Sequence, residues 1–391
     1  MTDETLFATA LEKSDSVERS AFLAELCGDS AQRGRVEALL AAHANAGEFL
    51  NRPAVDRPNP ENAATRTFSD GSADSATRTY DAETDFAPDD EILGFLKPSA
   101  RPDSLGRIGH YEVLEVLGRG GFGIVFRAFD EVLQRVVAVK VLAPQMAATS
   151  PARKRFIREA QSSAKVRHEN VVQIHATEEQ PLPYLVMEFI PGETLQERLD
   201  RTGPLELPEV LRFGRQIAEG LAAAHAQGLV HRDIKPANVM IEGGPQEHVK
   251  LTDFGLARAA DDASISQSGV VAGTPMYMAP EQAKGETLDH RADLFSLGSV
   301  LYVMCTGRPP FRATTTLAVL KRVADEQPRP IREVIPEVPA WFCRIVEKLH
   351  AKRPEDRFQS ARELADVLGR CLAEIQRPGA TPSLPELQPA M

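Results

Sequence analysis

The chain has 391 residues, 42% hydrophobic and 26% charged, which is ordinary for a globular protein and enough for two or three domains. Its formal net charge of −11 argues against a nucleic-acid partner, because phosphate recognition needs clustered Lys and Arg side chains. The four cysteines lie too far apart for a paired metal site or a disulfide framework, and no apolar run is long enough to cross a membrane. These features predict a cytoplasmic protein with no membrane segment.

The first hundred residues differ in character from the rest. Residues 1–50 carry apolar side chains at three-to-four spacing, which predicts a small helical module without recognisable chemistry. Residues 51–107 are rich in Pro, Ser, Thr, Asp and Ala, a composition that buries little surface. This segment is therefore predicted to be a flexible linker.

From Tyr111 the pattern changes to short strand-like runs, "YEVLEVLG", "GIVFRAFD" and "RVVAVKVL". A helical run follows, with Ser150 as its predicted N-cap, and helical periodicity dominates after Thr194. The order predicts an α+β domain over residues 108–372, with a strand-rich lobe before a helix-rich lobe. Residues 373–391 form a Pro-rich tail.

The first candidate site is the glycine-rich stretch "GRGGFGIV", with Gly118, Gly120 and Gly123. A plain hairpin turn also uses glycines, so the spacing alone is weak. A strand rather than a helix is predicted after Gly123, which argues against a dinucleotide-binding fold. The stretch instead suits a hairpin whose bare backbone lies over phosphate oxygens.

The next two candidates are a lysine and a glutamate. Lys140 lies in a β-branched strand, where alternation places it on the same face as Ala138. Glu159 shares a helical stripe with Phe156 and Ser163. Alternatively, the lysine extends from an edge strand to water and the glutamate is simply solvated.

The stretch "HRDIKPAN", from His231 to Asn238, places five polar groups between two apolar runs, which are predicted to be short buried strands. Asp253 begins "DFG" after a further strand-like run. Asn238 and Asp253 offer the hard oxygen atoms that suit magnesium on phosphates, and Asp233 could accept a hydroxyl proton. Each aspartate could alternatively cap a turn.

Taken in order, the glycine loop, strand lysine, helix glutamate, "HRDIKPAN", "DFG" and "APE" resemble the protein-kinase signature. With "GTPMYMAPEQ" and "DHRADLFSLGSVLYVMCTGRPPF", residues 111–372 resemble the catalytic domain of bacterial eukaryotic-like Ser/Thr protein kinases. The N-terminal "RVEALLAAH" adds a resemblance to those of planctomycete-type bacteria. The resemblance implies the two-lobed kinase fold and magnesium-dependent transfer of the ATP γ-phosphate to Ser or Thr of protein substrates, including itself, in signal transduction. Manganese is an alternative metal.

The resemblance also implies a role for each matching residue. Asp233 would orient or deprotonate the acceptor hydroxyl, and Lys235 would steady the transferring phosphoryl group. Asn238 and Asp253 would hold magnesium. The nucleotide would be bound by Leu117, Gly118, Gly120, Gly123, Val125, Ala138, Lys140, Met187, Glu188, Ile190 and Met240, with Glu159 paired to Lys140.

Other matching residues are expected to be structural. Asp293 resembles the aspartate that fixes the catalytic loop, and Glu281 and Arg357 resemble a buried ion pair. Ser163 departs from the family, which usually has an apolar residue there to link the lobes.

Two Ser/Thr-rich segments suggest regulation. Ser264, Ser266 and Ser268 are candidates for autophosphorylation, with Arg232 as the residue that would bind the phosphate. In the linker, Thr67, Thr77 and Thr79 are further candidates. The "TFSD" around Thr67 resembles phosphothreonine sites bound by forkhead-associated domains, and a bland spacer is the alternative.

A pseudokinase scaffold and a small-molecule phosphotransferase are the two alternative functions. A pseudokinase scaffold would keep the fold without the reaction, but it usually lacks the strand lysine or one of the two aspartates, and all three are present here. A small-molecule phosphotransferase is disfavoured by the "APE" segment, which shapes a peptide-binding surface in the family.

Overall fold

The computed structural model describes residues 93–120, 123–244, 247–254, 275–377 and 382. The chain divides into two units, Met1–Ala82 and Glu83–Met391, and all described residues belong to the second unit. The helical module predicted at residues 1–50 lies outside the described residues. No helix among the described residues combines the length and apolar character that a membrane crossing requires.

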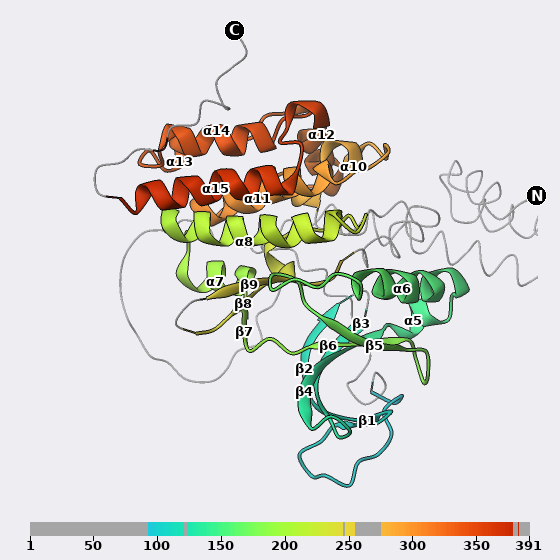
Figure 1. The fold of residues 1–391 in the computed structure, drawn as a ribbon. Coiled ribbons are helices and arrows are strands. Elements are labelled where there is room, and N and C mark those ends of the chain that lie inside the picture. Colours follow the sequence, from blue (N-terminus) through green and yellow to red (C-terminus); the bar gives the residue numbers. More distant parts are fainter. Residues whose placement is uncertain (1–92, 121–122, 245–246, 255–274, 378–381, 383–391) are drawn as a thin grey trace, which may run out of the picture. The chain divides into compact units, whose positions relative to one another are not determined.

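The strand-rich lobe is built on a six-stranded antiparallel sheet with the order β1-β2-β3-β4-β6-β5 (Figure 1). Its strands are β1 (Gly106–Ile108), β2 (Tyr111–Gly120), β3 (Gly123–Asp130), β4 (Arg135–Leu142), β5 (Ile174–Glu178) and β6 (Tyr184–Glu188). The three strand-like runs of the sequence are confirmed as β2, β3 and β4. Their β-branched and aromatic residues suit a pleated, half-buried surface.

The two faces of this sheet bury different sets of residues. Val137 and Val139 of β4 join one apolar cluster with Phe126. Ala138 and Leu142 join the cluster on the opposite face. The predicted alternation is confirmed, and it places Lys140 on the face of Ala138.

Residues 93–108 belong to the strand-rich lobe, which corrects the predicted linker boundary at residue 107. Phe95 packs edge-to-face on Phe126, with ring centroids 6.2 Å apart. Buried Glu112 of β2 lies 3.4 Å from Arg107 Nε. The segment is thus held by four apolar side chains and one buried carboxylate of β2; the four are Leu93, Phe95, Leu96 and Ile108.

Helix α6 (Ser150–Ser163) follows the short α5 (Pro144–Ala147) and covers one face of the sheet (Figure 1). The predicted N-cap is wrong by one residue, because Thr149 precedes the helix and makes no side-chain cap bond. The Thr149 hydroxyl instead donates to Met146 O at 2.9 Å. Four residues at helical spacing are buried against the sheet, Ala152, Phe156, Ala160 and Ser163.

The helical lobe is formed by α7 (Leu195–Thr202), α8 (Leu207–His225), α10 (Pro280–Ala283), α11 (Arg291–Thr306), α12 (Thr316–Asp325), α13 (Ile331–Val334), α14 (Ala340–Leu349) and α15 (Ala361–Ile375). Helices α8, α11 and α15 lie side by side around its core (Figure 1). The predicted periodic residues of α8 are all buried, namely Val210, Phe213, Ile217, Leu221 and Ala224. Helix α15 runs three residues past the predicted boundary at 372, and Ile375 packs on this core.

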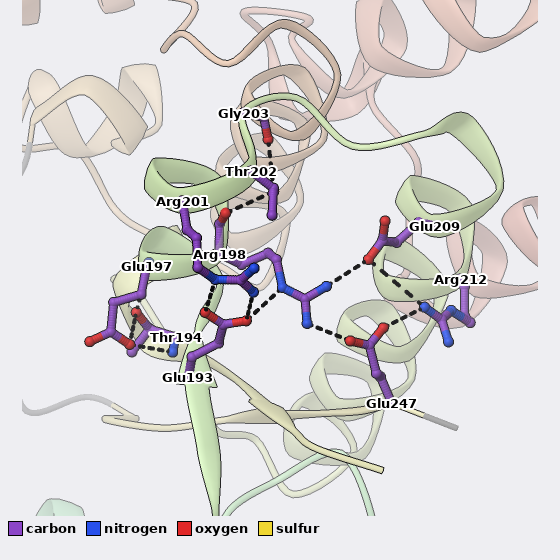
Figure 2. A network of polar contacts seen from close by, with 10 residues as sticks. All are labelled: Glu193, Thr194, Glu197, Arg198, Arg201, Thr202, Gly203, Glu209, Arg212 and Glu247. Carbon is purple, nitrogen blue, oxygen red and sulfur yellow. Dashed lines mark hydrogen bonds and ion pairs between the residues drawn. The ribbon is translucent and has the colours of Figure 1, made fainter. Parts of the chain in front are cut away.

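A small sheet, β7 (Gly192–Thr194), β8 (Val239–Glu242) and β9 (His248–Leu251), lies beneath these helices. Figure 2 shows the polar network that attaches it, centred on Arg198 of α7. Arg198 lies 2.6 Å from Glu193 and 3.1 Å from Glu209, and also pairs with Glu247. Because β8 directly follows the "HRDIKPAN" loop, this network fixes one end of the loop.

Candidate active site

The glycine-rich stretch forms the predicted hairpin between β2 and β3, with Gly118 opposite Val125 and Gly120 opposite Gly123. Gly123 has φ 149°, and a Cβ there would lie 1.9 Å from Val141 O, so only glycine fits. At Gly118 and Gly120 an added Cβ would meet nothing within 4 Å. These two glycines therefore leave a bare backbone beside open space, as a phosphate-covering loop requires.

Lys140 is 7% exposed, and its Nζ lies 2.7 Å from Asp253 Oδ1. The predicted partner was Glu159, but among the ion pairs between described residues Lys140 is paired with Asp253. A nearly buried ammonium group requires a close counter-charge, and Asp253 supplies it. Burial would raise the pKa of Asp253, but Lys140 outweighs it and holds this pKa below its usual value.

The backbone at Asp253 brings this carboxylate to Lys140. Asp253 has φ 61°, a left-handed conformation that is uncommon for residues other than glycine. Phe254 is buried and its ring lies 4.4 Å from that of His231. Strain of this kind persists where the surroundings enforce it, and it is characteristic of functional sites.

The "HRDIKPAN" loop gathers its own polar groups around Asp233. Lys235 Nζ lies 2.9 Å from Asp233 Oδ2. Asn238 Nδ2 donates to the same oxygen at 2.9 Å and to Asp233 O at 2.8 Å. One carboxylate oxygen is thus held by two donors, which fixes the orientation of the group.

The apolar runs that flank this loop differ from each other. Val239–Ile241 lie in β8 as predicted, whereas Leu229 and Val230 are not in a strand. The start of the loop is held instead by Asp293, which accepts from His231 N at 2.8 Å and Arg232 N at 2.7 Å. The structural role expected for Asp293 is confirmed.

His225 is a residue that the sequence analysis missed. Its Nε2 lies 2.8 Å from Asp293 Oδ2, so it supports the aspartate that holds the loop. Burial alone would raise the pKa of Asp293, but the hydrogen bond and charge of His225 keep this pKa low. No spacing in the sequence connects a helix residue at 225 with one at 293, so only the tertiary structure could identify it.

The other expected ion pair is also present. Arg357 donates to both oxygens of Glu281, at 2.7 and 2.8 Å, and both side chains are buried. A two-pronged pair of this kind fixes the geometry of the "APE" segment against the helical lobe.

A small hollow of about 10 Å³ lies between α6 and the sheet, and Phe254 and Met187 line it. Ser163 lines it, and the buried Ser163 hydroxyl has no hydrogen-bond partner among the described residues. The serine at this position therefore leaves the packing between α6 and Phe254 incomplete, which agrees with its departure from the family.

The predicted adenine-binding residues lie where β6 leads into the helical lobe. Ala138 lies opposite Met187, and Val125 and Met240 pack at the edge of the same apolar cluster. Glu188 accepts from Lys250 Nζ at 2.8 Å, a contact that joins β6 to β9. Ile190 is buried in this cluster, whereas Leu117, the remaining predicted contact, is 44% exposed.

Asn238 and Asp253 fit a hard divalent cation. Thr252 N donates to Asn238 O at 3.0 Å, so the backbone before Asp253 lies beside Asn238. The Nδ2 of Asn238 is used by Asp233, which leaves its carbonyl oxygen Oδ1 as the ligand atom. Magnesium typically takes one or two protein oxygens and completes its shell with phosphates and water.

The comparisons with known proteins agree with this geometry. The family model for the protein kinase domain matches residues 111–369. A probable serine/threonine-protein kinase of Streptomyces coelicolor is 42% identical over 72% of this chain and 42% of its own length. Serine/threonine-protein kinase PknB of Mycobacterium tuberculosis is 40% identical over 66% of this chain and 42% of its own length.

Solved structures give the same result. The kinase domain of Mycobacterium tuberculosis PknI matches with a TM-score of 0.56 at 29% identity, covering 69% of this chain and 99% of that domain. The chain spans about two fifths of the length of the curated relatives named above. On the family model and the site geometry together, the chain belongs to the protein kinase domain family.

Proposed function

We propose that the chain is an ATP- and magnesium-dependent serine/threonine protein kinase that acts in the cytoplasm, where ATP is the available donor. The observation that carries the proposal is the carboxylate of Asp233, held by Lys235 and Asn238 in one loop. A backbone hydrogen bond from Thr252, which follows strand β9, to Asn238 joins that loop to the residue before Asp253. An acceptor-orienting group and a metal-binding group are thus adjacent.

The roles of the side chains follow from their chemistry. Asp233 is the base that aligns the acceptor hydroxyl and takes its proton. Lys235 carries positive charge to the transferring group, and Lys140 does the same on the nucleotide side. A loose phosphoryl-transfer transition state needs this positioning and charge neutralisation more than covalent assistance. Magnesium, or manganese, held by Asn238 and Asp253, would neutralise the phosphates.

The test compares three single substitutions that leave the core packing unchanged. Asp233→Asn and Lys140→Met should each reduce transfer of the γ-phosphate of ATP to a basic model protein by at least 100-fold. Asp325 is exposed, and Asp325→Asn removes one negative charge as Asp233→Asn does, so it should leave the rate unaltered. Circular dichroism and thermal unfolding of each variant verify the fold. Wild-type rates in Asp233→Asn would refute the mechanism.

The same assay distinguishes an active kinase from the second candidate function, a pseudokinase scaffold. That reading requires wild type to be as inactive as Asp233→Asn, although it binds nucleotide. The intact Lys140, Asp233 and Asp253 support the active enzyme.

Regulation by phosphorylation remains a proposal on sequence grounds. Ser264, Ser266 and Ser268, and the linker threonines Thr67, Thr77 and Thr79, lie outside the described residues. A phosphothreonine-reading partner for Thr67 likewise rests on the "TFSD" pattern alone. Phosphopeptide mapping after incubation with ATP, with Asp233→Asn as the blank, identifies which of these six residues are modified.

A further inference from the structure

Helix α6 has an outer face that the proposed active site does not use. Its buried residues face the sheet, whereas Arg153, Lys154, Arg158 and Gln161 face away from it, and partly buried Ile157 lies at the boundary and also packs on the core cluster beneath the helix. With α5 and the turn after β5, this outer face encloses a hollow of about 440 Å³, here called the α6 hollow. Its lining is Ala147, Ala148, Ser150, Arg153, Lys154, Ile157, Arg158, Gln161 and Glu179.

The α6 hollow is positively charged in a protein of net charge −11. Arg153 is paired with Glu179, at 2.7 Å between Nη2 and Oε2. Lys154 and Arg158 have no ion-pair partner in the part of the chain that the structure describes. They are four residues apart on one helix face, so their like charges repel each other. A ligand with carboxylates would remove this repulsion.

The hollow also has an apolar element. Ile157, Ala147 and Ala148 also line the hollow, where Ile157 and Ala147 are partly buried against the core cluster. A partner that carries an aromatic or aliphatic side chain among acidic residues would therefore match both properties of the surface. Charge complementarity of this kind chiefly sets specificity and association rate.

One segment of this chain has that composition. Residues 83–91, "ETDFAPDDE", carry Glu83, Asp85, Asp89, Asp90 and Glu91 around one phenylalanine, Phe86, and include no Lys or Arg. The segment ends two residues before Leu93, where the described chain begins.

Leu93, where the described chain begins, belongs to the same lobe as the hollow. Leu93 and Leu182 pack on one apolar cluster, on the face of the sheet opposite α6. Leu182 is three residues from Glu179, which lines the hollow. Nine residues span up to ~30 Å at ~3.3 Å each, and the segment would pass the edge of the sheet at β5 to reach the outer side of α6. Short tethers of this kind produce millimolar effective concentrations, so weak contacts suffice for binding.

We propose that the α6 hollow binds residues 83–91 of the same chain, with the carboxylates on Lys154 and Arg158 and Phe86 against Ile157. The bound segment would fix the position of α6, the helix that carries Glu159. The proposal is independent of the proposed enzymatic activity, because it concerns a binding surface alone.

The first experiment is zero-length carbodiimide cross-linking of the full chain, followed by peptide mass mapping. A carbodiimide joins an amine directly to a carboxylate in contact with it. Lys154 should become linked to an acidic residue of 83–91, and the yield should fall several-fold in 0.5 M salt, which screens exposed charges. Lys165, an exposed lysine just beyond α6 and outside the hollow, is the matched control and should not be linked.

A mixture of ¹⁴N- and ¹⁵N-labelled protein identifies whether the linkage is within one chain. Links of a single isotope at 1 µM support the proposal, whereas mixed-isotope links overturn it in favour of a second copy. Equal linking of Lys154 and Lys165, or no link from Lys154, overturns it as well.

The second experiment reverses the charges of the hollow. Lys154→Glu with Arg158→Glu should raise the hydrogen-exchange rate of residues 83–91 at least fivefold. Lys165→Glu with Arg167→Glu makes the same change in net charge outside the hollow and should leave these rates unaltered. Equal exchange in wild type and both variants would show that the segment is not bound there.

Discussion

Lys140 has two candidate carboxylate partners, Glu159 and Asp253. The resemblance to kinases pairs it with Glu159, whereas the structure places it 2.7 Å from Asp253. In the proposed reaction Asp253 binds magnesium and Lys140 binds phosphates, so their ion pair must open when the nucleotide enters. The site therefore holds two opposite charges that neutralise each other until a ligand separates them.

His350 carries a prediction about pH. Its side chain is fully buried edge-to-face against Phe295 and Phe311, and its Nε2 lies 3.1 Å from Ser299 Oγ. Burial, together with the charges of Lys352 and Arg357, lowers its pKa to about 3. Below pH ~6.5 the unfolded chain therefore binds a proton that the folded chain does not, so stability falls as the pH falls.

This linkage should cost about 2 kcal/mol of unfolding free energy between pH 7 and pH 5. Urea unfolding at the two pH values measures the loss, and His350→Gln should show about 2 kcal/mol less of it. The window lies above the usual range of carboxylate pKa values, so acidic groups contribute little to it. Equal losses in wild type and His350→Gln would show that the imidazole accepts its proton in the folded state.

At the scale of elements, Arg198 joins four of them. It links α7 to β7, to the start of α8 and to the turn before β9, through Glu193, Glu209 and Glu247 (Figure 2). The surrounding carboxylates would repel one another without it. The pKa of Glu193 is held low, chiefly by hydrogen bonds from Arg201 and Arg198.

Arg198→Met should therefore destabilise the protein by about 2 kcal/mol, since its side chain is only 16% exposed. Arg201→Met is the matched control, because Arg201 meets the same Glu193 with 59% of its side chain exposed. An exposed pair contributes about 0.5 kcal/mol. Thermal unfolding should show a drop of several degrees for the first variant and about 1 °C for the second. Equal drops would mean that solvent screens both pairs alike.

Elements were predictable from the sequence where one local pattern decides them. β2, β3 and β4 are short runs rich in β-branched and aromatic residues, and α8 keeps its apolar residues on one stripe, so both patterns agree with the tertiary packing. Residues 93–108 lack such a pattern. They are attached by a few apolar contacts and by Glu112, which no local pattern predicts. Leu229 and Val230 are apolar, but the bonds to Asp293 next to them replace a strand.

The site residues were predictable only as an ordered series. The hydrogen bonds of Asp233 lie within its own loop, so the order of the motif alone brings these residues together. The partners of Lys140, Asp293 and Glu188 come from distant parts of the chain, and sequence spacing carries no information about them. His225 and Lys250 were missed for this reason.

At the scale of the whole domain, the lobes meet at Glu188 and Lys250. The ion pair joins the last residue of β6 to β9, and the backbone N–H of Gln173 also donates to Glu188 Oε2 at 3.4 Å. This contact restrains the connection at which the proposed adenine site lies.

Lys250→Met should raise the KM for ATP by about threefold to tenfold with little change in kcat, because a loosened connection weakens nucleotide binding before it affects transfer. Steady-state kinetics of Lys250→Met, Glu188→Gln and the double variant provide the measurement. The double variant should be no worse than either single one, since both remove the same contact. Additive effects, or a loss confined to kcat, would contradict this role.

The attachment of residues 93–108 has a mechanical consequence. Strand β1 pairs in register with the start of β2, from Gly106 opposite Val113 to Ile108 opposite Tyr111. The far end of β2 is the glycine hairpin that would cover the phosphates. Tension applied to the chain before Leu93 would therefore act on β1 and, through its pairing, on the strand that ends at this hairpin. A force on the N-terminal part of the protein would be transmitted to the nucleotide site without passing through the helical lobe.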